Sequence, residues 1–181
     1  MAFTEGTGID WLGVAVIDGY DAAPALGSLT FAIFLSAMTL ARWVGPAALD
    51  RYGRVTVVRA TGLAAIAGLG LVVFGGSLPV AMAGAALWGI GVALGFPVGM
   101  SAAADDPRHS AGRVSVVSSI GYLAFLAGPP LIGFLGHEVG TLRALTAATG
   151  LVSIGLLISG VLRPPELKQD VDATVAVRAG A

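Results

Sequence analysis

The chain has 181 residues, of which 56% are hydrophobic and only 12% charged, and its formal net charge at pH 7 is −1. Because a soluble domain carries roughly 25% charged residues, this composition and a mean hydropathy of +0.87 exclude an ordinary soluble protein and indicate an integral membrane protein. The sequence contains no cysteine, so disulfides and thiolate-bound metals are excluded as well.

The first segment, residues 1–21, contains acidic residues but no lysine or arginine. It is not typical of a signal peptide, which begins with a basic region. The apolar stretch from Ile9 to Ile17 favours the second half of a membrane-spanning helix whose first half is absent. The alternative is a short amphipathic segment that lies on the outer membrane surface.

Stretches without any charged residue follow at 22–41, 60–104, 114–136 and 144–162. A helix needs about 20 apolar residues to cross the hydrocarbon core of a bilayer. The second stretch is long enough for two crossings and is interrupted by the turn sequence Gly75-Gly76-Ser77-Leu78-Pro79. The sequence therefore predicts an all-α membrane protein. Its domain, residues 22–163, holds five spanning helices, near 23–44, 56–74, 78–102, 113–135 and 142–162.

The basic residues indicate how these helices are oriented. All Lys and Arg residues except Arg143 fall on one side of the membrane once the five spans are drawn. Short basic loops stay in the cytoplasm. We therefore expect a multi-pass protein of the inner (cytoplasmic) membrane, with the turn at 75–79 outside and the C-terminus inside. The polar residues 164–181 are expected to form a disordered cytoplasmic tail.

Small residues and prolines mark two of the spans. The third span contains glycines four residues apart and one proline: Gly91, Gly95, Gly99 and Pro97. Glycines at this spacing share one helix face and allow another backbone to approach closely, and the proline should bend the helix. The fourth span contains Gly128, Pro129 and Pro130, and the prolines leave backbone carbonyls without helical partners.

A charged motif, Asp50-Arg51-Tyr52-Gly53-Arg54, connects the first span to the second. It resembles the signature loop of the major facilitator superfamily, in which a glycine precedes an Asp-Arg-x-Gly-Arg run. In this chain four residues separate Gly45 from Asp50, where three are commoner in the family. The aspartate can cap the next helix, the glycine permits a turn with positive φ, and the arginines can pair with acids or carbonyls of a neighbouring helix.

Other segments look like later helices of sugar-permease-like members of the same superfamily. They are Glu5-Gly6 with Asp10-Trp11, then 94–97 and 121–130. The resemblance implies that residues 1–21 hold the end of the seventh helix and that the five spans are helices eight to twelve of twelve.

This resemblance implies transport of a small solute by alternating access, with a proton as a candidate coupling ion. It assigns the gating loop to Asp50, Arg51, Gly53 and Arg54. Candidates for the substrate cavity or for proton coupling are Glu5, Asp10, Trp11, Trp88 and Tyr122, because intramembrane acids are usually functional and aromatic rings can form cavity walls. The N-terminal half of the transporter is the expected partner, besides the bilayer. We expect no enzyme activity, cofactor, metal site or nucleic-acid partner.

An alternative of another class stays open. The chain could be a small membrane scaffold that packs through its glycine-rich helix faces. This alternative predicts a stable homo-oligomer, whereas the transporter interpretation predicts that the isolated chain does not transport.

Overall fold

A computed structural model describes residues 1–164, and these residues form helices without any β-strand. The predicted tail, apart from Pro164, lies outside the described residues. The helices in chain order are α1 (Ala2–Tyr20), α2 (Pro24–Tyr52), α3 (Arg54–Phe74), α4 (Leu78–Val92), α5 (Gly95–Ala103), α6 (Ser110–Val139), α7 (Thr141–Ala144), α8 (Thr146–Ile158) and the 3₁₀ helix η1 (Ser159–Leu162).

The prediction of an all-α bundle with five spanning helices is confirmed. The helical segments long and apolar enough to cross a bilayer are Pro24–Tyr52, Arg54–Phe74, Leu78–Ala103, Ser110–Val139 and Thr141–Leu162. Helices form here because a helix pairs almost all of its backbone groups internally, which an apolar environment requires. Turns are short, and glycines with positive φ stand at three of them: Gly53, Gly76 and Gly140.

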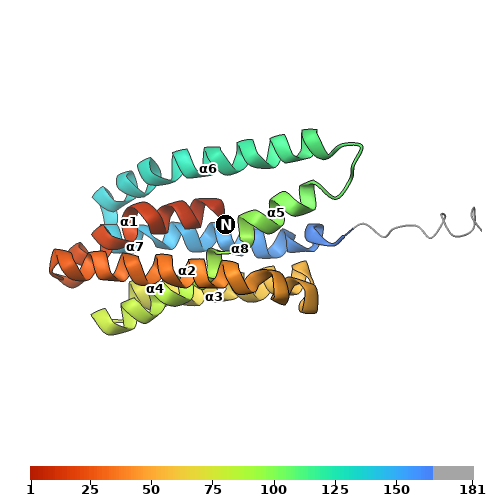
Figure 1. The fold of residues 1–181 in the computed structure, drawn as a ribbon. Helices are drawn as coiled ribbons and strands as arrows, with labels where there is room; N and C mark the ends of the chain where they lie inside the picture. The colour runs from red at the N-terminus through yellow and green to blue at the C-terminus, as the bar shows by residue number, and fades with distance from the viewer. Residues whose placement is uncertain (165–181) are drawn as a thin grey trace, which may run out of the picture.

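The first helix packs inside the bundle. Figure 1 shows α1 (red) between α6 and α2, with its first residue about midway along the length of the bundle. Its first turns are buried, and Leu12 and Val16 have no exposed surface. This packing against α2 and α6 favours a spanning helix over a surface segment, although Ile9, Asp10 and Val14 stay exposed along one side of α1. The helix is also longer than the predicted stretch from Ile9 to Ile17.

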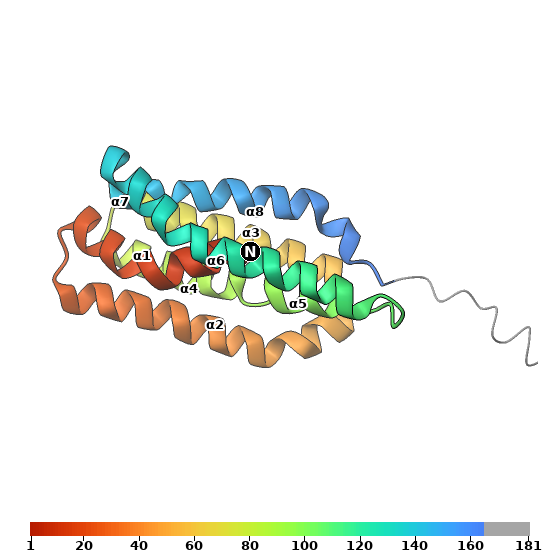
Figure 2. The same cartoon turned by 90° about the horizontal axis from the view of Figure 1, so that it is seen from above.

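The most extensive packing joins α3 to α4. A side chain added to Gly68 or Gly84 would meet backbone atoms of the opposite helix at 2.4 and 2.7 Å, respectively. These two glycines therefore let the two backbones approach closely. The side chain of Trp88 in α4 packs edge-to-face on Phe34 of α2, with ring centroids 5.2 Å apart. Figure 2 shows α2 and α8 on opposite sides of this assembly.

The two ends of the bundle differ in charge. At one end, here called the basic end, lie the junctions at 52–54, 104–109 and 159–163 (Figure 1). Its arginines outnumber its acids: Arg51, Arg54, Arg108, Arg113 and Arg163 against Asp50, Asp105 and Asp106. The opposite end, called the acidic end, holds the junctions at 20–24, 74–78 and 139–141, with Asp18, Asp21 and Glu138 against Arg143.

Candidate functional site

An ion pair between a buried glutamate of α1 and a partly exposed arginine joins α1 to α2. Nη2 of Arg42 donates a hydrogen bond to Oε1 of Glu5 at 2.5 Å, and the side chains are 40% and 9% exposed, respectively. Arg42 lies ten residues before the end of α2, which is roughly 15 Å along the helix axis. Charged groups are costly inside an apolar bundle and usually mark function. This pair is therefore the centre of the candidate site.

Arg42 also forms a hydrogen bond at the break between α4 and α5. Its Nε donates a hydrogen bond to the carbonyl of Ala93 at 3.1 Å. In a continuous helix that carbonyl would accept from the residue four positions later, but this residue is Pro97, which has no N–H. The guanidinium thus supplies the donor that the proline lacks. One side chain thereby connects α1, α2 and the α4–α5 break.

Sequence reasoning missed Arg42. It was placed at the end of the first span, because the charge-free stretch stops at Ala41, yet α2 continues to Tyr52. The apolar residues after Arg42 were a signal that the helix goes on. The acidic partner, Glu5, was among the sequence candidates, and the structure brings it to an arginine that was not.

The charged motif, predicted as a loop, lies almost entirely within helices. α2 runs through Tyr52, and only Gly53, with φ 77°, separates it from α3. The expectation that Asp50 caps α3 was wrong, because Asp50 lies in the last turn of α2 and the cap position is Gly53, which forms no side-chain cap bond. Arg51 lies over the Tyr52 ring, 5.4 Å from its centroid.

Arg54 is the motif residue that reaches another helix. Its Nη1 pairs with Oδ2 of Asp105 at 2.5 Å, and its Nη2 donates to Oγ of Ser101 at 3.1 Å. Ser101 belongs to α5, and Asp105 follows it. Pairing of a motif arginine with an acid beside a neighbouring helix agrees with the sequence expectation. In the same turn, hydrogen bonds from the His109 side chain and the Arg108 backbone N–H lower the pKa of Asp106.

Besides Glu5, two further cavity candidates lie on α1. Asp10 is exposed, whereas Trp11 is partly buried and its indole N–H donates to the carbonyl of Pro129 at 3.1 Å. A side chain added to Gly133 would lie 3.0 Å from the Trp11 ring. Trp11 therefore fastens α1 to the proline-containing part of α6, while Asp10 remains on an uncovered surface.

The other two aromatic candidates do not share a site with the ion pair. Trp88 is fully buried against Phe34 in the core, and its indole nitrogen has no hydrogen-bond partner among the described residues. Tyr122 is 64% exposed on α6.

The predicted packing residues differ in what surrounds them. A side chain added to Gly91 would lie 2.3 Å from the Ala65 backbone nitrogen of α3, whereas nothing lies within 4 Å of one added to Gly99. The break at 93–94 separates these two glycines into different helices, and Gly95 contacts the side chain of Met1. Pro129 and Pro130 lie within α6. A side chain added to Gly128 would lie 3.5 Å from the Phe3 ring.

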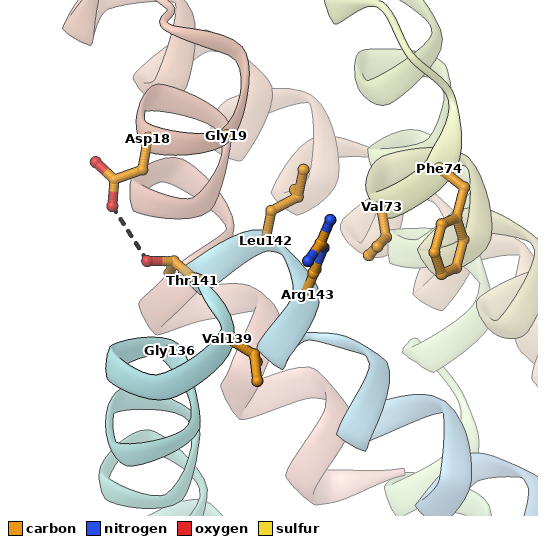
Figure 3. A pocket seen from close by; sticks show the side chains of 10 residues that line it. Asp18, Gly19, Val73, Phe74, Gly136, Val139, Thr141, Leu142 and Arg143 are labelled. Atoms are coloured by element: carbon orange, nitrogen blue, oxygen red, sulfur yellow. Dashed lines mark hydrogen bonds between the residues drawn. The ribbon is translucent and has the colours of Figure 1, made fainter.

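A pocket of about 530 Å³ opens at the acidic end, where α1, α3, α6 and α7 meet. Figure 3 shows Asp18 of α1 beside Thr141 of α7, whose hydroxyl donates to the carboxylate at 3.1 Å. Arg143 and Phe74 line the same pocket. Its polar groups hold the turn after α6 against α1, at the end of the bundle that lies away from the motif residue Arg54. Among the described residues, no group of three or more His, Asp or Glu side chains could hold a metal ion.

These features define a helical membrane bundle with a charged pair at a broken helix and an arginine motif at one end. The family model described as Major Facilitator Superfamily matches residues 2–179. The chain belongs to this superfamily. Its family and the names of its relatives group it with transporters rather than with enzymes, as the sequence led us to expect.

Curated relatives are similar over most of this chain. An uncharacterized transporter of Sinorhizobium fredii is 34% identical over 81% of the chain and 39% of its own length. An uncharacterized MFS-type transporter of Yersinia pestis is 30% identical over 87% of the chain and 40% of its own length. The membrane protein MosC of Rhizobium meliloti is 30% identical over 86% of the chain and 38% of its own length. The chain thus spans about two fifths of each relative, and no solved structure matches it.

Proposed function

We propose that the chain forms helices seven (in part) to twelve of a major facilitator transporter and moves a small solute by alternating access together with an N-terminal half. The family match and the share of its relatives that the chain spans support this assignment. The described part contains α1 and five segments able to span a membrane. Transporters of this architecture rock two halves around a central site, so one half supplies one wall.

The observation that carries the proposal is the Glu5–Arg42 pair at the break between α4 and α5. Transporters bind substrates and coupling ions at discontinuous helices, whose free backbone groups line the site. A carboxylate held by an arginine beside such a break can exchange partners when a solute or proton arrives. Glu5 is therefore the proposed coupling residue, and Asp10, exposed on the same helix, is proposed to face the solute path.

The charge difference between the two ends supports an orientation. Short basic segments remain in the cytoplasm. We therefore propose that the protein lies in the inner membrane and that its basic end faces the cytoplasm. The C-terminus would then be cytoplasmic, and the acidic end would face outward. The gating role of the motif is proposed for Arg54, because this residue links the start of α3 to the end of α5.

The first experiment measures the mass of the native product in membranes with an antibody against residues 166–181. We expect a band at least about twice the 18.0 kDa of this chain, because a complete transporter of this family has twelve helices. A band at 18.0 kDa alone, purified as a homo-oligomer without another membrane chain, would contradict the proposal and favour the scaffold alternative.

The second experiment tests coupling in the complete product. Vesicles that contain it are screened for solutes whose addition moves protons, as followed by a pH-sensitive dye. We expect Glu5→Gln to abolish proton movement while solute exchange persists, because glutamine cannot carry the proton. An unchanged proton flux in Glu5→Gln would refute the coupling role. Vesicles with this chain alone should show no flux.

A further inference from the structure

A second pocket lies between α2 and α5, near the basic end, and has a volume of about 260 Å³. Two arginines and one serine share its lining with apolar side chains: Arg42, Arg54, Ser101, Pro46, Leu49, Leu94, Pro97 and Val98. Its wall is thus largely apolar, with cationic groups contributed by two different helices. This combination fits a small molecule that has both an apolar body and an anionic group.

Each of the two arginines has a nitrogen that donates no hydrogen bond to another residue within 1–164. A guanidinium has five N–H donors. Arg42 uses Nε and Nη2, and Arg54 uses Nη1 and Nη2. Within residues 1–164, Nη1 of Arg42 and Nε of Arg54 have no partner. The acids that pair with these arginines, Glu5 and Asp105, are not among the lining residues, and each is bonded to a different guanidinium nitrogen from the one without a partner.

The surroundings of the pocket attract anions. Arginines outnumber acids at the basic end, and a surplus of one sign raises the local concentration of oppositely charged groups. Basic pockets between spanning helices on the cytoplasmic side bind anionic headgroups. Arg42 and Arg54 are 40% and 24% exposed, so an arriving group can reach both side chains.

We propose that this pocket binds a phosphate group attached to a small apolar body, with Arg42 and Arg54 as its ligands. Arginine suits this role because its planar donors match phosphate oxygens. The inference goes beyond the proposed transport function and does not depend on it. The phosphate group could come from a membrane lipid or from a soluble phosphate ester, and the experiment below separates these sources.

The test uses the full chain purified in detergent and follows its thermal unfolding by tryptophan fluorescence. The probes are phosphatidylglycerol, phosphatidylcholine as a zwitterionic control, and hexyl phosphate as a soluble ester with a short apolar body. We expect phosphatidylglycerol to raise the unfolding midpoint by about 5 °C at saturation and phosphatidylcholine to have a much smaller effect. A rise with phosphatidylglycerol alone identifies a lipid source, and an equal rise with hexyl phosphate identifies a soluble ester.

Substitutions in the pocket test whether it causes the rise in the unfolding midpoint. Arg42→Gln and Arg54→Gln should each remove most of the shift, whereas Arg108→Gln should keep it, because Arg108 is exposed at the same end but does not line this pocket. Arg54→Gln gives the decisive result if Arg42→Gln does not fold. The proposal is overturned if no phosphate probe shifts the midpoint, or if Arg108→Gln loses as much of the shift as Arg54→Gln.

Discussion

The guanidinium of Arg42 donates a hydrogen bond to the carbonyl of Ala93, the one acceptor in that turn that Pro97 deprives of its helical donor. Proline removes a backbone N–H and separates α4 from α5 at this point. A buried carbonyl without a partner costs about 1–3 kcal/mol, so the arginine makes the break tolerable inside the bundle. The same side chain holds Glu5, and the break is thereby tied to α1.

This relationship predicts that the effects of two substitutions are coupled. In Pro97→Ala the alanine N–H can reach the Ala93 carbonyl, so Arg42→Gln should destabilise this variant less than it destabilises the original chain. The expected difference is about 1 kcal/mol or more. Thermal unfolding of the purified single and double variants measures it. Strictly additive effects would mean that the arginine does not replace the missing donor.

A second prediction concerns two glycines of the third span. Gly91→Ala should destabilise the chain by about 1–3 kcal/mol, because its new side chain would lie 2.3 Å from the backbone of Ala65. Gly99→Ala is the matched control, since nothing lies within 4 Å of its added side chain. It should be neutral or stabilise the helix by up to about 1 kcal/mol. Thermal unfolding compares the two, and equal losses would argue against close packing of α3 on α4.

A third prediction concerns orientation and uses the absence of native cysteine. A membrane-impermeant maleimide added to intact cells should label Ser77→Cys, in the exposed turn between α3 and α4, but not Pro107→Cys, in the exposed turn after α5. The second variant should react only after the cells are opened. The reverse pattern would place the basic end outside and contradict the proposed topology.

The number and approximate position of the spans followed from the sequence, because charge-free stretches of sufficient length have few other structures available. The ends of the spans were harder to predict. α2 extends past Val44 to Tyr52, and the pairing of Arg42 with Glu5 on α1 leaves no local pattern in the sequence. Glu5 was a candidate because acids are rare in spanning helices. The contact between Trp88 and Phe34 depends on how α2 crosses α4, which one sequence does not reveal.

The most direct test of the site is a double-mutant cycle on Glu5 and Arg42, followed by thermal unfolding of the purified chain. Arg42→Gln should cost about 2–4 kcal/mol, because it leaves a buried carboxylate unpaired. Glu5→Gln should cost only about 1 kcal/mol, since Arg42 is 40% exposed and keeps its bond to Ala93. The double variant should then be more stable than the sum of the single effects by about 1–3 kcal/mol. Additive losses, or a larger loss for Glu5→Gln than for Arg42→Gln, would contradict a charged pair that joins α1 to α2.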